Sequence, residues 1–125
     1  MNTELQNKLF KKYPKLFRQR ELSMQETCMC WGIACGDGWY WLIDNLCNYI
    51  SLMDKTVEAT QVKEKFGTLR FYTNCGSDEI DAAISFAGLL SGKICEVCGS
   101  TDAKVRGKGW LMARCDTCLE KRGKD

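Results

Sequence analysis

Near the end of the chain lies the stretch CEVCGSTDAKVRGKGWLMARCDTC (residues 95–118), which begins and ends with a Cys-x-x-Cys pair. Sixteen residues separate the two pairs. Two short turns that each offer two thiolates can supply the four ligands of a tetrahedral zinc ion. Gly99 can adopt a positive φ after the first pair, and Gly107 and Gly109 allow a hairpin between the pairs. We therefore expect one structural zinc ion with no coordination position open to a substrate. Its predicted ligands are Cys95, Cys98, Cys115 and Cys118.

Composition predicts a folded protein of the cytoplasm. The chain has 125 residues, of which 45% are hydrophobic and 27% are charged, and this balance argues against disorder. No apolar run reaches the length of a membrane span, and the N-terminal residues are charged rather than signal-like. The nine cysteines are odd in number and four of them have zinc spacing, which favours a reducing compartment over a disulfide scaffold.

The formal net charge of +2 gives no strong indication of a nucleic-acid partner. Four thiolates and one Zn²⁺ together carry −2, so the metal-bound protein is close to neutral. The charge is nevertheless segregated along the chain. Residues 1–20 contain six Lys/Arg and one Glu, whereas residues 21–60 contain six acidic residues and one Lys. The two regions could face each other in the fold or mark surfaces for different partners.

Hydrophobic periodicity predicts three helices before the cysteine pairs. A capping box at Thr3 with Gln6 starts the first helix, and Pro14 ends it. The second helix starts with Asp37 as its N-cap. Its apolar stripe consists of Trp39, Leu42, Ile43, Leu46, Tyr49, Ile50 and Met53. Ser77 caps the third helix, and Gly92 stops it.

A β-hairpin is expected between the second and third helices, because the apolar period there changes to two. A four-residue loop EKFG (64–67) would pair Lys63 with Thr68 and place Val62 opposite Leu69. The predicted fold class is therefore α+β, with about three helices packed on a hairpin or small antiparallel sheet and a C-terminal four-cysteine zinc ribbon. We expect residues 1–92 to form the core domain and residues 93–125 to form a zinc-ribbon module packed on it.

Three stretches together resemble a known family. They are CGDGWYWLIDNLC (35–47), QVKEKFGTLRFY (61–72) and the terminal Cys-x-x-Cys-Gly, Gly-Trp and Cys-x-x-Cys elements. This set is similar to a family of small, functionally uncharacterised proteins encoded by bacteriophages and prophages. The resemblance implies a phage accessory protein that acts in the bacterial host cytoplasm. It supplies no catalytic residues.

The aromatic residues around the second helix have two interpretations. Trp31, Trp39, Tyr40 and Trp41 form a dense group. Core packing or cover for a neighbouring loop is one interpretation, and exposed aromatics beside acidic residues as a binding surface is the other. On the second interpretation, the protein modulates or inhibits a host protein, such as a defence or replication component. The candidate contact residues are Asp37, Tyr40, Trp41 and Asp44.

Binding of nucleic acid is the first alternative function. Cations beside aromatic residues on the hairpin and on the ribbon could contact phosphates while a ring stacks on a base. The candidate residues are Lys63, Arg70, Tyr72, Lys104, Arg106, Lys108 and Trp110. A solvated sheet face would equally explain the hairpin residues, and electrostatic support of the zinc–thiolate centre would explain those of the ribbon.

A thiol-dependent enzyme is the second alternative. Cys35 precedes a predicted helix start, where the helix dipole favours a thiolate. The chain has no His, which excludes the usual Cys–His pair, and no other catalytic motif occurs, so we expect no enzyme. The upstream cysteines are expected to be buried free thiols, with a second metal site as the alternative. They are Cys28, Cys30, Cys35 and Cys47.

Overall fold

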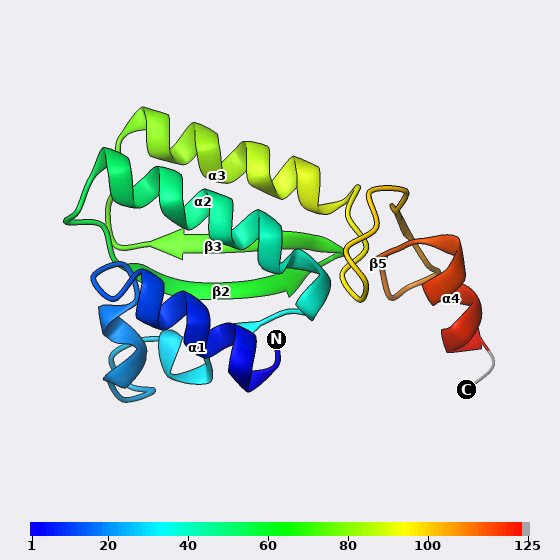
Figure 1. Cartoon of the computed structure of the whole chain (residues 1–125), viewed down its shortest axis with the longest axis horizontal. Helices are drawn as coiled ribbons and strands as arrows, with labels where there is room; N and C mark the ends of the chain where they lie inside the picture. The colour runs from blue at the N-terminus through cyan, green and yellow to red at the C-terminus, as the bar shows by residue number, and fades with distance from the viewer. Residues whose placement is uncertain (124–125) are drawn as a thin grey trace.

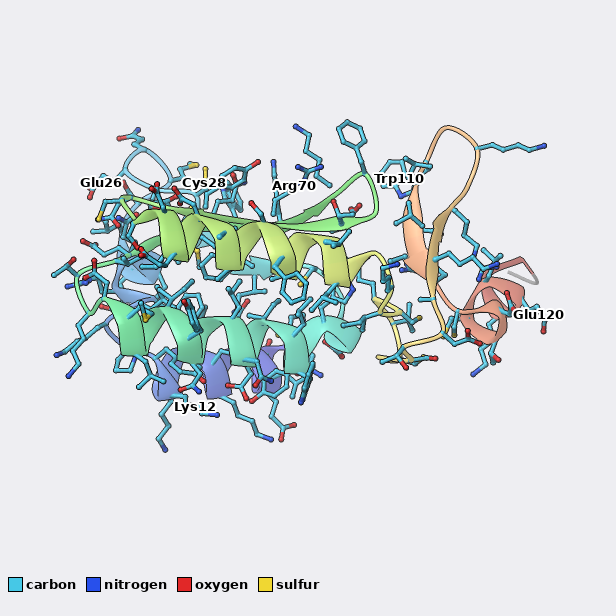
Figure 2. The ribbon with its side chains drawn as sticks, turned by 90° about the horizontal axis from the view of Figure 1, so that it is seen from above. Lys12, Glu26, Cys28, Arg70, Trp110 and Glu120 are labelled. Atoms are coloured by element: carbon cyan, nitrogen blue, oxygen red, sulfur yellow. The ribbon has the colours of Figure 1, made fainter. Side chains whose placement is uncertain are left out.

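The computed structural model describes residues 1–123 and has an α+β fold, which confirms the expected class (Figure 1). Its helices are α1 (Thr3–Lys12), α2 (Tyr40–Met53), α3 (Asp78–Ser91) and α4 (Asp116–Gly123). Three 3-10 turns lie in the connections, at Arg18–Glu21, Met29–Trp31 and Asp37–Trp39. Helices α2 and α3 lie side by side on one face of a sheet, and α1 packs beside α2 (Figures 1 and 2). None of the helices in the described part is both long and apolar enough to cross a membrane.

The main sheet has three strands in the order β1–β2–β3. Strand β1 (Ile33–Ala34) runs parallel to β2 (Ala59–Lys65), which pairs antiparallel with β3 (Thr68–Thr73). The expected hairpin is present, and β1 adds a parallel strand that the sequence did not indicate. Strand β1 is short and lies in a segment without a clear period, which explains why it was missed.

The predicted register of the hairpin is wrong by two residues. Its turn consists of Phe66 and Gly67 alone, with φ of 56° and 83°, so Lys65 pairs with Thr68 and Val62 pairs with Phe71. The Glu64 carboxylate accepts a hydrogen bond from the N–H of Gly67 at 2.8 Å and stabilises this tight turn. A shift of two residues leaves every side chain on its predicted face.

Two of the predicted helix caps are also wrong, because the side chains bind elsewhere. Asn2 caps α1 by accepting from the N–H of Leu5 at 2.8 Å, while Gln6 accepts from the N–H of Ile33 at 2.8 Å and ties α1 to β1. Asp37 accepts from the backbone and side-chain nitrogens of Asn2, at 2.7 and 2.9 Å. Both side chains therefore connect distant segments. The predicted Ser77 cap of α3 is confirmed.

The core lies between the helices and the sheet. Trp39, Phe17 and Ile43 are among its completely buried side chains. Most of the stripe predicted for α2 is buried, whereas Tyr49 and Met53 are exposed, so the stripe narrows toward the end of the helix.

The C-terminal part contains the predicted hairpin between the cysteine pairs. Strand β4 (Lys104–Arg106) pairs antiparallel with β5 (Met112–Arg114), and Gly107 and Gly109 in the connection have φ of 125° and 80°. The tip of the β2–β3 hairpin reaches this second hairpin, because a Cβ on Gly67 would lie 2.8 Å from a methyl group of Val105. The division at residue 92 stays a prediction, and the last two residues of the predicted module lie outside the described residues.

Candidate metal centre

The four predicted ligands come together at one point. The sulfur atoms of Cys95, Cys98, Cys115 and Cys118 all lie within 4.8 Å of one another, and those of Cys98 and Cys115 are 3.7 Å apart. Tetrahedral coordination with zinc–sulfur bonds near 2.3 Å requires sulfur–sulfur distances of about 3.8 Å. The cluster can therefore hold a tetrahedral metal ion. In residues 1–123 it is the one group of three or more His, Cys, Asp or Glu side chains with such geometry.

Local backbone geometry positions the first cysteine pair. The N–H of Gly99 donates to the carbonyl of Cys95 at 2.9 Å, and the N–H of Cys95 donates to the carbonyl of Ser100 at 2.8 Å. Gly99 has a φ of 83°, as the sequence predicted, and this conformation closes the turn. The second pair is positioned differently, because Cys115 follows β5 and Cys118 lies in the first turns of α4.

Backbone hydrogen bonds favour the thiolate form of Cys95, which is the form that binds a metal ion. Burial alone would raise the pKa of Cys95, but backbone N–H groups of Cys115, Cys98 and Val97 point at its sulfur and lower the pKa to about 6. Burial and the neighbouring thiols raise the pKa of Cys118 to about 12. Binding of a cation would release the protons that the thiols still hold.

The turn with the first cysteine pair, residues 95–99, docks directly on the start of α2. We call this turn the metal loop. The N–H of Gly38 donates to the carbonyl of Glu96 at 2.8 Å, and the buried indole N–H of Trp39 donates to the carbonyl of Ile94 at 2.8 Å. A Cβ on Gly38 would collide with the carbonyl oxygen of Cys95. The metal loop thus packs against the Gly-Asp-Gly-Trp segment (residues 36–39), a contact that the sequence pattern did not predict.

Ion pairs fix the side of the metal loop that faces β5. Glu96 accepts from the N–H of Gly36 at 2.8 Å with one carboxylate oxygen and lies 3.5 Å from Arg114 with the other.

A second ion pair connects β4 to α4. Arg106 lies 2.8 Å from Asp116 at the start of α4, and this contact lowers the pKa of the Asp116 carboxyl. Arg106, a predicted nucleic-acid contact, therefore has one guanidinium nitrogen engaged within the ribbon, while its Nε and Nη2 are buried with no hydrogen-bond partner in residues 1–123.

Three of the four predicted protein-binding residues line one hollow of about 510 Å³. They are Asp37, Tyr40 and Trp41, and the opposite wall is formed by Cys98, Gly99 and Thr101 of the metal-binding part. Leu5, Leu42 and Ile94 supply apolar lining.

Asp44 lies outside this hollow. Its carboxylate is 3.0 Å from the ammonium group of Lys12 and accepts from the hydroxyl of Tyr13 at 2.6 Å. Its environment is therefore part of the packing between α1 and α2, because both partners come from the end of α1. Sequence spacing alone placed it near Asp37 and could not reveal these partners.

The aromatic group divides between core and surface. Trp39 is fully buried and Tyr40 is half-buried, but Trp41 and Trp31 are 66% and 69% exposed. Core packing, one of the two interpretations of this group, therefore holds fully for Trp39 alone. Trp41 is a large exposed side chain on the lining of the hollow that Cys98 also lines.

The β2–β3 hairpin brings its predicted cations and aromatic residue onto one face. Lys63 pairs with Arg70, and Gln61 pairs with Tyr72, so these four side chains share the face turned away from α2 and α3. Arg70 points away from the helices, and Trp110 lies on the same side of the molecule (Figure 2). The other ribbon residues, Lys104 and Lys108, are exposed.

The upstream cysteines do not form a second metal cluster within residues 1–123. Cys35 and Cys47 are buried, as predicted, whereas Cys28 is exposed and Cys30 is half-buried. Burial raises the pKa of Cys35 to about 12, which is the opposite of the effect expected from a helix start. The loss of solvent thus outweighs the opposing effect of the N-terminal ammonium group at this thiol.

The described residues therefore offer a four-thiol metal centre and, against one side of it, a hollow with an exposed tryptophan. Both features include residues of the metal loop. Comparison with protein-family models, with curated proteins and with solved structures gives no match for this chain.

Proposed function

We propose that this chain is a small zinc-binding accessory protein that binds a protein partner through the hollow at Trp41. The observation that supports this most directly is the position of Trp41, which is 66% exposed on the lining of a hollow whose other wall belongs to the metal centre. The zinc ion would hold that wall in place, so partner binding would depend on the metal.

Zinc is the metal that best suits the ligand set. Four cysteine thiolates in a tetrahedral arrangement are typical of structural zinc sites, and soft sulfur ligands disfavour magnesium and calcium. All four ligand positions are protein thiols, which leaves no position for a substrate. A structural role for the ion follows, with its binding energy contributing to folding.

The chemistry of the hollow favours a protein as the partner. Tryptophan and tyrosine supply large amphipathic contact surfaces at low conformational cost and are enriched at the energetic centres of protein interfaces. Leu5, Leu42 and Ile94 provide an apolar floor that a partner side chain could fill. Asp44 lies outside the hollow and pairs with Lys12, and both carboxylate oxygens of Asp37 accept from Asn2, so the contact would be mainly aromatic and apolar.

The resemblance to phage proteins supports a host protein in bacterial cytoplasm as the partner, for example a defence or replication component that the chain modulates or inhibits. The buried state and raised pKa of Cys35 count against the alternative of a thiol-dependent enzyme.

The test is affinity capture from bacterial lysate with three forms of the zinc-loaded chain: wild type, Trp41→Ala and Trp31→Ala. Trp31 is the matched control because it is equally exposed but lies away from the hollow. We expect a stoichiometric protein that is retained by wild type and Trp31→Ala and lost from Trp41→Ala and from protein stripped of zinc. Capture that is indifferent to Trp41, or no captured protein, would refute the proposal.

A further inference from the structure

We propose that the outer edge of β3 is a second docking site, where an extended acidic segment of a protein partner adds a fourth strand to the sheet. This site is separate from the hollow at Trp41. It is formed by β3 and α3, whereas the hollow is formed by α1, the start of α2 and the metal loop.

The hydrogen-bond register leaves the backbone of β3 open on one side. Strand β3 is at the edge of the sheet, because the strand order is β1–β2–β3. The tight turn makes Lys65 and Thr68 a hydrogen-bonded pair, so Thr68, Arg70 and Tyr72 direct their backbone groups toward β2. Phe71 and Thr73 consequently direct theirs away from the sheet. The N–H of Asn74 turns back to Glu58 at 2.9 Å, which agrees with this alternation.

Helix α3 covers the end of the β3 edge that lies near the β2–β3 turn. The N–H of Leu69 donates to the hydroxyl of Ser91 at 2.8 Å, and that hydroxyl in turn donates to the carbonyl of Gly88 at 2.6 Å. The part of β3 near the turn is thus already occupied by the end of α3. The backbone groups of Phe71 and Thr73 remain for an added strand.

A groove of about 690 Å³ runs beside this edge, between β3 and α3. Ser85 and Gly88 form part of its α3 wall and leave room for incoming side chains. Ile84 and Leu89 offer apolar contacts, and Leu89 is 61% exposed in the isolated chain. An added strand would direct every second side chain toward this apolar wall.

The cations of the β2–β3 hairpin indicate the composition of a segment that could pair with β3. Lys63, Lys65 and Arg70 lie on the open face of the hairpin, and none of them forms an ion pair within residues 1–123. The alternate side chains of an added strand would lie beside Arg70 and Tyr72, where carboxylates are favoured. The matching segment directs apolar residues toward the α3 wall, which also carries Asp81, and acidic residues toward Arg70 on the opposite face.

A second copy of the chain fits this edge less well. Antiparallel pairing of two β3 strands about Phe71 would bring the cations of both sheets onto one continuous face. Like charges that lie close together across strands are destabilising. Single-stranded nucleic acid could also use the cations, but it would leave the strand edge and the apolar groove unexplained.

The probe is a blocked peptide of alternating valine and glutamate, titrated into the ¹⁵N-labelled, zinc-loaded full chain. The control peptide has lysine in place of glutamate. We expect amide shift changes concentrated in β3 and α3, and affinity at least about tenfold weaker for the lysine peptide. The Trp41→Ala variant should bind the peptide as wild type does, which separates this site from the proposed function.

Two variants test the strand geometry. Thr73→Pro removes an outward N–H, and Thr73→Val keeps it as the matched control. Gly88→Leu fills the groove through a helical position, so it tests the same site without replacing a residue of β3. Thr73→Pro and Gly88→Leu should each weaken peptide binding about tenfold, with Thr73→Val unchanged.

Several results would overturn the proposal. One is peptide binding that is equally strong in Thr73→Pro and Gly88→Leu, because contact through charge alone would explain it. Another is a single-stranded oligothymidylate that binds more tightly than the peptide and requires Arg70 but neither the Thr73 N–H nor the groove. A third is concentration-dependent dimerisation that protects the β3 amides, which would assign the edge to a second copy.

Discussion

Trp39 and Ile94 are joined by a buried hydrogen bond of 2.8 Å from the indole N–H to the backbone carbonyl, across 55 residues of sequence. Trp39 is the largest fully buried side chain of the core, and Ile94 directly precedes Cys95, the first of the four clustered cysteines. The bond therefore connects the centre of the hydrophobic core to the start of the metal loop.

Replacing Trp39 with Phe should destabilise the fold by about 1–3 kcal/mol, because the carbonyl of Ile94 loses its donor in a buried place. The smaller ring adds a cavity cost in the same direction. Urea unfolding of the zinc-loaded protein measures the change. Trp41→Phe is the control, since Trp41 is exposed and should alter stability little. Equal stability of the Trp39→Phe variant and wild type would contradict the role assigned to this bond.

Gly38→Ala should weaken both stability and metal binding. The added Cβ would collide with the carbonyl of Cys95 and displace the metal loop, at a cost of about 1–3 kcal/mol. Transfer of zinc to a chromophoric chelator should be faster than in wild type. Gly88→Ala, in the interior of α3, is the matched control and should be neutral or stabilising, because its Cβ would make only an ordinary contact. A normal rate of zinc transfer from Gly38→Ala would show that the loop adapts freely.

Alkylation should separate eight of the nine cysteines into three classes. Cys28 and Cys75 are exposed and should react first, whereas the buried Cys35 and Cys47 should react only after unfolding. Burial raises the pKa of both buried thiols, so raising the pH to about 9 should not release them. The four clustered cysteines should react after chelation of the metal. Mass spectrometry of timed iodoacetamide reactions gives the order, and early labelling of Cys35 would contradict it.

The Asp44 carboxylate should stabilise the fold in a pH-dependent way. Burial opposes its ionisation, but the hydrogen bond from Tyr13 and the contact with Lys12 lower the pKa of Asp44 below its ordinary value. The contribution is therefore fully present above the unfolded-state pKa of about 3.9 and is lost as the pH falls through the lower folded-state value. Asp44→Asn should cost about 1 kcal/mol near neutral pH.

That difference between wild type and Asp44→Asn should shrink toward zero as the pH is lowered to about 2. Urea unfolding at a series of pH values measures it. Lys12→Gln should show part of the same loss, because it removes the charge partner while leaving the Tyr13 hydrogen bond. A difference that stays constant across the acid range would mean that the ionised form has no special role.

Local patterns in the sequence predicted most of the elements. The spacing of the cysteines predicted the four-thiol cluster, because two tight turns that each carry two cysteines can be recognised without knowledge of the remaining chain. The helical period of α2 and the Ser77 cap of α3 also depend on neighbours in sequence. The α+β class followed from the order of these elements.

The errors occurred where a distant segment competes for a side chain or sets a backbone conformation. Gln6 and Asp37 have good local capping roles, yet β1 and Asn2 take them instead. Phe66 adopts a positive φ that is unusual for an aromatic residue, and so the two-residue turn was missed. The docking of the metal loop on Gly38 is likewise tertiary, although two glycines before a buried tryptophan are a signal that could have suggested a close backbone approach.

The docking of the metal loop has a consequence for any attempt to dissect the chain. A fragment that ends at residue 92 would lose the carbonyl groups of Ile94 and Glu96, which accept hydrogen bonds from Trp39 and Gly38. The indole N–H of Trp39 and the backbone N–H of Gly38 would then lose these acceptors, and the Trp39 indole is buried in the core. The metal-binding segment therefore completes the interior of the part that precedes it, and a ribbon transplanted from another protein would have to reproduce those two carbonyl positions as well as its own ligands.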